Sequence, residues 1–160
     1  MRTAALKRSM PQVEVRAGTP DDLDIVVALE ANVFAADCLA RKCLKRFLSV
    51  PTAQVLIAEC NGETIGCAII SFRAANSLAR LYSLGVAPLA EGAGVAAILL
   101  DAAEAAARRR GCSEIRLEVH ENNPRAIACY RKAGYTEFGR HVGYYKDLGD
   151  ALRFRKALAA

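Results

Sequence analysis

The segment from Leu78 to Arg110 constrains the fold of this chain more than any other part of its sequence. It opens with a largely apolar run, 78–86, that is typical of a strand and that stops before Pro88. A glycine-containing turn follows, and further along, Gly111 after three arginines is a typical helix end. Between them, apolar residues recur at helical spacing: Val95, Ile98, Leu99, Ala102, Ala103 and Ala106. The segment therefore predicts a strand, a tight turn and an amphipathic helix over 94–110.

The turn before this helix has features of a phosphate-binding site. Gly92 and Gly94 have no Cβ, so a ligand can approach the backbone closely at both positions. The amides of a helix's first turn have no partner inside the helix, and the helix dipole makes that end positive. The turn lacks the lysine of a Walker loop and the third glycine of a dinucleotide fingerprint. A tight turn without any ligand is the alternative, and the turn alone does not decide between them.

Hydrophobic patterning divides the rest of the chain into short strands and helices. Asn61-Gly62 between two apolar runs predicts a hairpin, because a type I′ turn needs positive φ at two successive residues. Thr19-Pro20 and Asn123-Pro124 each place a capping residue before a proline that suits the first helical position. The predicted strands are 13–15, 55–60, 64–72, 78–86, 115–119, 135–140 and 152–156, and the predicted helices are 20–30, 39–48, 94–110 and 124–133.

Length and composition bound the class of protein. The chain has 160 residues, 53% of them hydrophobic and 24% charged, which is typical of a globular domain rather than a disordered chain. No apolar run approaches the roughly 18 residues that a membrane-spanning helix needs. We expect a disordered tail over 1–10 and a single domain over 11–160, as a monomer or a homodimer.

The cysteines and the charges narrow the functional classes further. No cysteines form a C-x-x-C pair, and none lies at zinc-binding spacing to His120 or His141, so we expect no metal. Nothing indicates a secreted disulfide framework, which favours a reducing, cytoplasmic compartment. The net charge of +5 is spread too diffusely for a nucleic-acid site, so we expect neither a nucleic-acid nor a membrane partner. The six cysteines are Cys38, Cys43, Cys60, Cys67, Cys112 and Cys129.

Two motifs, kept at a fixed separation, resemble the acetyl-coenzyme A site of the GNAT superfamily of N-acetyltransferases. Glu91-x-x-Gly94-x-Ala96 is similar to that family's pyrophosphate loop, Gln/Arg-x-x-Gly-x-Gly/Ala. The resemblance covers about 13–158 and implies an α+β fold. This fold is a mixed, mostly antiparallel sheet of six to seven strands, with about four helices on both faces and a splay at the cofactor. The second motif is Leu117-Glu118-Val119 followed by Asn123-Pro124-x-Ala126-Ile127-x-x-Tyr130-x-Lys132-x-Gly134-Tyr135.

The resemblance implies acetyl-coenzyme A as the co-substrate and assigns residues to its parts. The backbone of one strand would pair with the pantetheine arm, main-chain amides of the turn and helix would hold the pyrophosphate, and Asn123 would contact the cofactor near the thioester. The strand residues are Leu84, Gly85 and Val86, and the pyrophosphate residues are Gly92, Ala93, Gly94, Val95, Ala96 and Ala97.

The same resemblance implies Glu118 as general base and Tyr130 as general acid, with direct transfer in a ternary complex. A carboxylate can take the proton that an ammonium must lose before it attacks, and a phenol can protonate the departing thiolate. The structural alternatives are a solvent-facing strand residue for Glu118 and a core aromatic for Tyr130. His120 is a rival base, but the sequence shows no orienting partner and favours a surface histidine. Cys129 is a possible nucleophile with no base partner in view.

The C-terminal part bears on the acceptor. Gly143-Tyr144-Tyr145 and Asp150-Ala151-Leu152 resemble the end of the RimI-type branch, which acetylates protein N-terminal amines, as on ribosomal proteins. His141, Tyr144 and Tyr145 would lie in a loop over the acceptor channel, or the two tyrosines would pack at a sheet edge. Phe34 and Asp37 would help to shape the pocket.

Three functions remain open. The leading one acetylates a peptide or protein N-terminal amine. The second acetylates a small amine such as a polyamine or aminosugar, and an acidic acceptor pocket would favour it. The third is a non-catalytic acyl-coenzyme A binding module.

Glu91 departs from the family pattern. The family usually has Gln or Arg at this position, and often a basic residue where Ala93 stands. A carboxylate beside a pyrophosphate costs about 1 kcal/mol of binding energy if it is exposed and screened. If Glu91 points to solvent, the amides of the turn suffice for the pyrophosphate. If it does not, either the affinity for the cofactor is lower or another basic group compensates the charge of Glu91.

Overall fold

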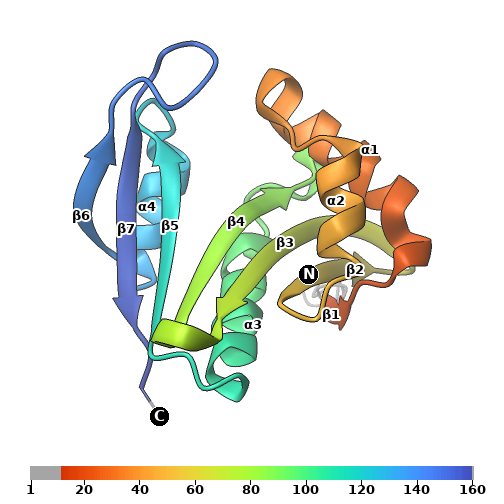
Figure 1. Cartoon of the computed structure of the whole chain (residues 1–160). Helices are drawn as coiled ribbons and strands as arrows, with labels where there is room; N and C mark the ends of the chain where they lie inside the picture. Colours follow the sequence, from red (N-terminus) through yellow and green to blue (C-terminus); the bar gives the residue numbers. More distant parts are fainter. Residues whose placement is uncertain (1–11, 160) are drawn as a thin grey trace, which may run out of the picture.

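The computed structural model describes residues 12–159 and shows one seven-stranded sheet between two pairs of helices (Figure 1). The strand order is β1-β2-β3-β4-β5-β7-β6, and every neighbouring pair is antiparallel except β4 and β5. The predicted α+β fold with a mixed, mostly antiparallel sheet is confirmed. The predicted tail over 1–10 lies outside the described residues.

The elements follow the predicted order, with ends that differ by a few residues. The strands are β1 (Glu14–Ala17), β2 (Ala53–Cys60), β3 (Glu63–Arg73), β4 (Leu78–Val86), β5 (Glu114–His120), β6 (Thr136–His141) and β7 (Ala151–Ala157). The helices are α1 (Leu23–Phe34), α2 (Arg41–Phe47), α3 (Val95–Arg109) and α4 (Pro124–Lys132). No helix within 12–159 is long and apolar enough to cross a membrane.

Local sequence signals explain several of these boundaries. Asn61 and Gly62 have φ of 52° and 79°, as the predicted hairpin turn between β2 and β3 requires. Gly111 has φ of +77° just after α3, in agreement with its predicted role at the helix end. The first helix begins later than predicted, because a short 3₁₀ turn, Pro20–Asp22, precedes α1. The Asp22 carboxylate accepts a hydrogen bond of 2.8 Å from the Thr19 amide, which stabilises that turn.

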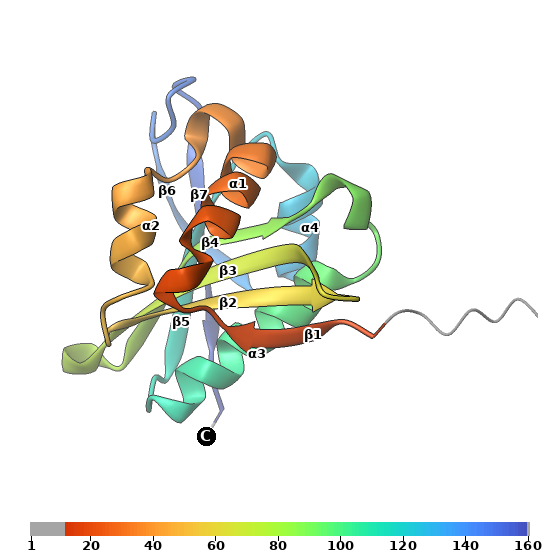
Figure 2. The same ribbon diagram turned by 90° about the vertical axis from the view of Figure 1, so that its right-hand side faces the viewer.

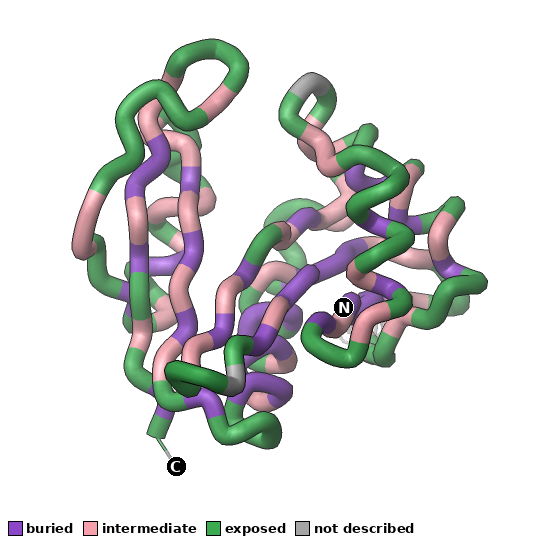
Figure 3. Tube along the Cα trace, in the orientation of Figure 1, coloured by how far each residue is buried: buried purple, intermediate pink, exposed green. Residues whose placement is uncertain are grey.

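Two apolar layers hold the helices on the sheet (Figures 1 and 2). Helices α1 and α2 pack on one face, where Val26 and Leu44 meet Ile57 and Ile69 of β2 and β3. Helix α3 packs on the other face, where its residue Leu99 belongs to a second buried cluster. Figure 3 shows the buried stretches concentrated in the central strands and along α3. Helices α1 and α2 cover one face of the first strands of the sheet. On that same face, β5, β7 and β6 carry no helix (Figure 1).

The sheet opens between its two parallel strands. β4 and β5 pair only over four residues, Leu78 to Leu81 of β4 with Glu114 to Leu117 of β5, and beyond them the two strands diverge. Tyr82 forms a bulge at the point of divergence, because Leu81 and Ser83 face consecutive residues of β3 and leave Tyr82 without a partner there. The backbone of β4 after Tyr82 therefore has a free edge that faces the opening, and the candidate site lies there.

Candidate active site

Two adjoining cavities occupy the opening between β4 and β5. The α3–α4 cavity has a volume of about 700 Å³ and lies at the start of α3 beside α4. The α1–loop cavity has a volume of about 480 Å³ and lies between α1 and the β6–β7 loop, residues 142–150. The two cavities share a wall made of Val33, Phe34, Leu84, Asn123, Ala126 and Tyr130.

The α3–α4 cavity contains the predicted phosphate turn. Gly92 and Gly94 have φ of +81° and +80°, a conformation that favours glycine, and a Cβ at Gly94 would meet no atom within 4 Å. The amides of α3's first turn have no acceptor inside the helix and lie beside this space. The turn thus has both properties that a diphosphate requires, namely free amides and an unobstructed backbone.

Most predicted cofactor residues line this cavity. Gly85 and Ala93 do not: a Cβ at Gly85 would lie 3.1 Å from the ring of Phe34, so this glycine allows α1 to pack closely on β4. Asn123 caps α4, because its side chain accepts a hydrogen bond of 3.2 Å from the Ala126 amide. The predicted residues that line the cavity are Leu84, Val86, Gly92, Gly94, Val95, Ala96, Ala97 and Asn123.

Glu91 has a basic partner that the sequence left unnamed. Its carboxylate accepts a hydrogen bond of 2.9 Å from Arg125 of α4, which also lines the α3–α4 cavity. Both side chains are at least half exposed. Arg125 therefore offsets the negative charge of Glu91 at the rim of the phosphate turn, and it is within reach of a diphosphate bound there.

We expect Glu91→Gln to tighten acetyl-coenzyme A binding by about fivefold, because it removes a repulsive carboxylate and frees Arg125 for the phosphates. Arg125→Gln should weaken binding by a similar factor. Isothermal titration calorimetry at fixed ionic strength measures both effects. Glu137→Gln, an exposed change on β6 that lies outside the lining of the α3–α4 cavity, is the matched control. Unchanged or weaker binding in Glu91→Gln would show that this carboxylate does not oppose the cofactor.

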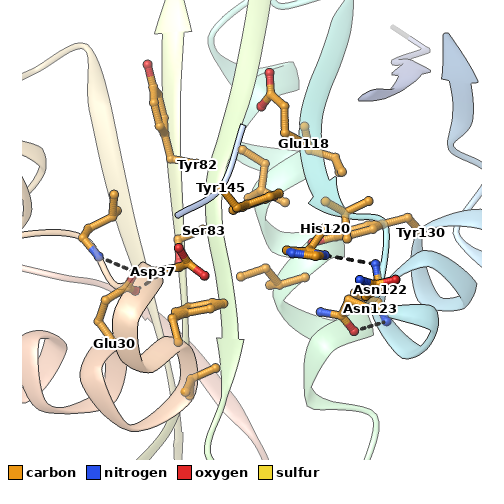
Figure 4. Close-up of a pocket in the computed structure, with 18 of the residues that line it drawn as sticks. Glu30, Asp37, Tyr82, Ser83, Glu118, His120, Asn122, Asn123, Tyr130 and Tyr145 are labelled. Carbon is orange, nitrogen blue, oxygen red and sulfur yellow. Dashed lines mark hydrogen bonds between the residues drawn. The ribbon is translucent and has the colours of Figure 1, made fainter. Parts of the chain in front are cut away.

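Tyr130 lies at the boundary between the two cavities (Figure 4). Its ring packs against Tyr135 and Phe154, with centroids 5.9 and 6.4 Å away, so the predicted core packing is present. Its hydroxyl has no hydrogen-bond partner among residues 12–159, and the residue lines both cavities. Burial raises the pKa of the Tyr130 phenol, which therefore stays protonated at neutral pH.

Glu118 lines the α1–loop cavity and is 12% exposed. It lies on the face of β5 opposite the buried Leu117 and Val119, as strand alternation predicts. Its carboxylate lies 3.2 Å from a terminal nitrogen of Arg80 and 4.0 Å from Nε of Arg153. Glu118 is therefore a largely buried, ion-paired group next to the point where β4 and β5 separate.

His120 has an orienting partner that the sequence did not reveal, and its side chain is 18% exposed. Its Nε2 lies 2.8 Å from the Asp147 carboxylate, and its ring stacks on Tyr145 at 4.6 Å. Its Nδ1 accepts a hydrogen bond of 3.0 Å from the Asn122 amide, which places the ring proton of a neutral imidazole on Nε2. Since both ring nitrogens are engaged, His120 anchors the β6–β7 loop rather than offering a free nitrogen to an acceptor.

The His120 anchor depends on a glycine in the loop. A Cβ at Gly149 would lie 2.4 Å from Nε2 of His120 and 2.8 Å from a carboxylate oxygen of Asp147. The Gly149 amide also donates a hydrogen bond of 2.8 Å to that carboxylate. This amide and the imidazole of His120 together lower the pKa of Asp147.

We expect Gly149→Ala to raise the KM for the acceptor amine by about tenfold, because the new methyl group displaces His120 and releases the β6–β7 loop. Acetyl-coenzyme A binding should not change, since the loop does not line the α3–α4 cavity. Steady-state thiol release measures the first effect and calorimetry the second. The control is Gly139→Ala on β6, where a Cβ would meet its nearest neighbour at an ordinary 3.6 Å. An unchanged KM in Gly149→Ala would remove the loop from acceptor binding.

The predicted acceptor residues fall into two groups. Phe34, Asp37 and Tyr145 line the α1–loop cavity. Tyr144 and His141 do not; their rings stack on each other at 5.5 Å, and the Tyr144 hydroxyl accepts a hydrogen bond of 3.3 Å from Arg80.

The α1–loop cavity has an acidic lining that the sequence did not reveal. Glu30 of α1 is 5% exposed and accepts hydrogen bonds of 3.1 Å from the Leu39 amide and from the Ser83 hydroxyl. Burial raises the pKa of the Glu30 carboxyl. Among the described residues, no lysine or arginine lines this cavity, and the titratable residues Glu30, Asp37, Glu118 and Asp147 that do so are acidic (Figure 4).

The structure gives little support to a cysteine nucleophile or to a metal site. Cys129 lines the α3–α4 cavity, but burial raises the pKa of its thiol and so disfavours the nucleophilic thiolate. Within residues 12–159, no group of three or more His, Cys, Asp or Glu side chains could hold a metal ion.

A splayed mixed sheet with a glycine turn at the start of its crossover helix defines a class of coenzyme A-binding transferases, and comparison with known proteins agrees. The model of the GNAT acetyltransferase family matches residues 26–135. The chain belongs to this family.

Three similar proteins illustrate the range of the family. An acetyltransferase from Pectobacterium atrosepticum is 30% identical over 125 residues, which are 77% of this chain and 87% of that protein. A mycothiol acetyltransferase from Stackebrandtia nassauensis is 38% identical over 73 residues, 46% of this chain and only 24% of that protein. Among solved structures, the ribosomal-protein-S18-alanine N-acetyltransferase from Escherichia coli has a TM-score of 0.85 at 22% identity. That match covers 93% of this chain and 96% of the other.

The chain therefore spans about a quarter of the mycothiol acetyltransferase that it matches. The likeness to the Escherichia coli enzyme, at 22% identity, shows the fold and does not by itself assign the acceptor.

Proposed function

We propose that this protein transfers the acetyl group of acetyl-coenzyme A directly to the N-terminal amine of a peptide or protein. One observation carries the proposal: Tyr130 separates a cavity with free helix amides from a cavity with acidic walls. The first suits a diphosphate and the second suits an ammonium ion. A transfer between the two ligands would take place at this boundary.

On the cofactor side, the backbone of the chain would make most of the contacts. Amides from Gly92 to Ala97 would hold the diphosphate, and the free edge of β4 after Tyr82 would pair with the pantetheine arm. Asn123 and Tyr130 would lie at the thioester end, because both line the shared wall. Acetyl-coenzyme A supplies the activated acyl group, and the protein would supply its position.

On the acceptor side, Glu118 would take the proton of the incoming ammonium, directly or through water. Tyr130, kept neutral by burial, would donate a hydrogen bond or its proton to the departing sulfur. Arg80 and Arg153 would hold the Glu118 carboxylate in place.

The charges of the α1–loop cavity favour an acceptor with one ammonium. Glu118 is paired with arginines, Asp147 with His120, and Glu30 accepts two hydrogen bonds. Among the residues described, Asp37 alone of the four acids has no hydrogen bond or ion pair, which leaves one carboxylate for one cation. An N-terminal amine meets this requirement, and the fold-level likeness to an N-terminal alanine acetyltransferase agrees with it.

A small polycationic amine is the second candidate. The acidic lining of the α1–loop cavity is the feature expected for such an acceptor, and Glu30 favours it further. This buried carboxyl has only uncharged donors, the Leu39 amide and the Ser83 hydroxyl. A second cation of a polyamine or aminosugar would stabilise its ionised form.

Thiol release from acetyl-coenzyme A tests the proposal on a panel of free-amino peptides, Nα-acetylated peptides, spermidine and glucosamine. We expect turnover on free-amino peptides and none once the terminus is blocked. Turnover on spermidine or glucosamine alone would contradict the peptide assignment. Binding of coenzyme A without turnover on any amine would identify a non-catalytic binding module instead.

A further inference from the structure

A row of arginines crosses the sheet face that carries no helix. Arg80 on β4 is in register with Arg116 on β5, and Arg116 is in register with Arg155 on β7. Residues directly opposite one another point to the same face, so three guanidinium groups stand side by side. Like charges in this arrangement destabilise a sheet. The repulsion among these arginines would fall if an anion bound to them, which points to a binding role for the row.

The ring of Phe138 on β6 contacts three arginines, and two of them belong to this row. The guanidinium carbons of Arg116, Arg153 and Arg155 lie 5.1, 4.6 and 5.1 Å from the centre of its ring. Arg153 is the residue opposite Glu118 on the neighbouring strand, so the cluster extends to the α1–loop cavity. We use the name arginine face for the set Arg80, Arg116, Phe138, Arg153 and Arg155.

The arginine face carries more positive charge than its own acids offset. Arg116 is paired with Glu114 at 2.5 Å, and Arg80 and Arg153 share the single carboxylate of Glu118. Arg155 is exposed and has no acidic partner within residues 12–159. Four cations thus face two carboxylates.

Two hydrogen-bond donors of the arginine face are also unused. The Nε atoms of Arg80 and Arg153 are buried, and neither has a hydrogen-bond acceptor in the described chain. A buried N–H without an acceptor is unfavourable, so neither guanidinium is fully satisfied within the described chain. The terminal nitrogens remain within reach of a ligand, since the two side chains are 28% and 31% exposed.

We propose that the arginine face binds acidic side chains of the acceptor polypeptide, close behind its N-terminal amine. This inference rests on the proposed function, because it places the amine in the α1–loop cavity. A chain that leaves the cavity past Glu118 next meets Arg80 and Arg153. Carboxylates match the forked donors of guanidinium groups in charge and in geometry. The preferred acceptor then has a free N-terminus followed by Asp or Glu.

Nucleic acid is the competing occupant of a basic, aromatic surface. Binding of single strands depends on bases stacking on free aromatic rings. The ring of Phe138 is surrounded by three guanidinium groups, and Tyr82 has the guanidinium of Arg80 at 4.4 Å. Guanidinium groups already lie over both rings and leave less ring surface for bases, so acidic side chains fit the surface better.

Fluorescence anisotropy tests the inference without requiring turnover. The probes are dye-labelled peptides of sequence Ala-Glu-Glu-Gly-Gly and Ala-Gln-Gln-Gly-Gly, titrated with the full chain in the presence of coenzyme A. We expect about tenfold tighter binding of the acidic peptide, and a preference that decreases as salt is added. Arg155→Gln should reduce the affinity for the acidic peptide about fivefold and leave the neutral peptide unchanged.

Two controls separate binding from folding. Arg109→Gln removes an exposed arginine at the end of α3, on the other side of the sheet, and should bind both peptides as the parent does. Because the row repels itself, Arg155→Gln should melt at the same temperature as the parent or higher. A lower melting temperature would show that Arg155 stabilises the sheet, and Arg116→Gln would then replace it in the titration.

Equal affinity for the two peptides, or an unchanged preference in the arginine variants, would overturn the inference. So would tighter binding of a labelled oligouridylate that the acidic peptide fails to displace. Failure of the proposed function would give a different result. If the acidic peptide binds more tightly but neither peptide is acetylated, the inference about the arginine face stands and the proposed function fails. Acetylation of both peptides at equal rates with equal affinity removes the arginine face alone.

Discussion

Replacing Glu118 with glutamine should reduce kcat on a peptide acceptor by about 100-fold or more, the contribution typical of a positioned general base. Glutamine keeps the shape of the side chain, but it loses the negative charge and cannot take a proton from an ammonium. Acetyl-coenzyme A affinity should be unchanged, since Glu118 does not line the α3–α4 cavity. Steady-state thiol release and calorimetry on the same preparation measure the two quantities.

The Glu118 variant also removes the charge that holds two arginines together, so its stability needs a separate measurement. Losing one partner of a partly buried ion pair leaves the other charge uncompensated. We expect a lower melting temperature but a folded protein at 25 °C, as judged by circular dichroism. Glu137→Gln, an exposed change on β6, is the control and should keep the parental kcat. A folded Glu118→Gln protein with a third or more of the parental kcat would exclude this carboxylate as the base.

Local signals in the sequence were sufficient for most of the fold. Asn61-Gly62, Asn123-Pro124 and Gly111 each fix a turn or a helix end through the backbone of one or two residues. Such signals depend on neighbours in the chain, so they can be recognised before any contact is known. The start of α1 was misplaced because its first turn depends on a side chain, Asp22, whose partners include Arg16 of the preceding strand.

The residues of the site likewise divide into those that a local motif reveals and those that only a long-range contact reveals. Gly92 and Gly94 could be found because a motif of adjacent residues forms the phosphate turn. Asp147 could not be found as the partner of His120, because 27 residues separate them and only the return of the β6–β7 loop brings them together.

The acidic cavity and the arginine face were invisible for a related reason. Glu30, on α1, and Arg155, on the last strand, look like ordinary charges of an amphipathic helix and a mixed strand. Only the packing of α1 on β4 buries the first, and only the pairing of β5 with β7 sets the second beside Arg116. The role of these two charges depends on which strands and helices are neighbours, and a single sequence does not show this.

Gly94→Asp should weaken acetyl-coenzyme A binding by about 100-fold, the largest effect on the cofactor that we expect from a single change. The φ of +80° at Gly94 is one that Asp and Asn tolerate better than other side chains, so the helix should still form. The new carboxylate would stand where the structure leaves free space for a diphosphate, and two like charges at about 4 Å repel strongly near a protein surface. Calorimetry with coenzyme A measures the loss.

The opposite end of the same helix provides a matched control for Gly94→Asp. Gly111 has almost the same φ, +77°, and a Cβ there would also meet nothing within 4 Å. Gly111→Asp should therefore cost similar backbone strain, about 1 kcal/mol, while leaving cofactor affinity unchanged, because it lies at the C-terminal end of α3. Gly94→Asn separates charge from bulk and should weaken binding only about tenfold. If Gly94→Asp and Gly111→Asp bound coenzyme A equally well, the amides at the start of α3 would not be the phosphate site, and the proposed transfer would lose its cofactor end.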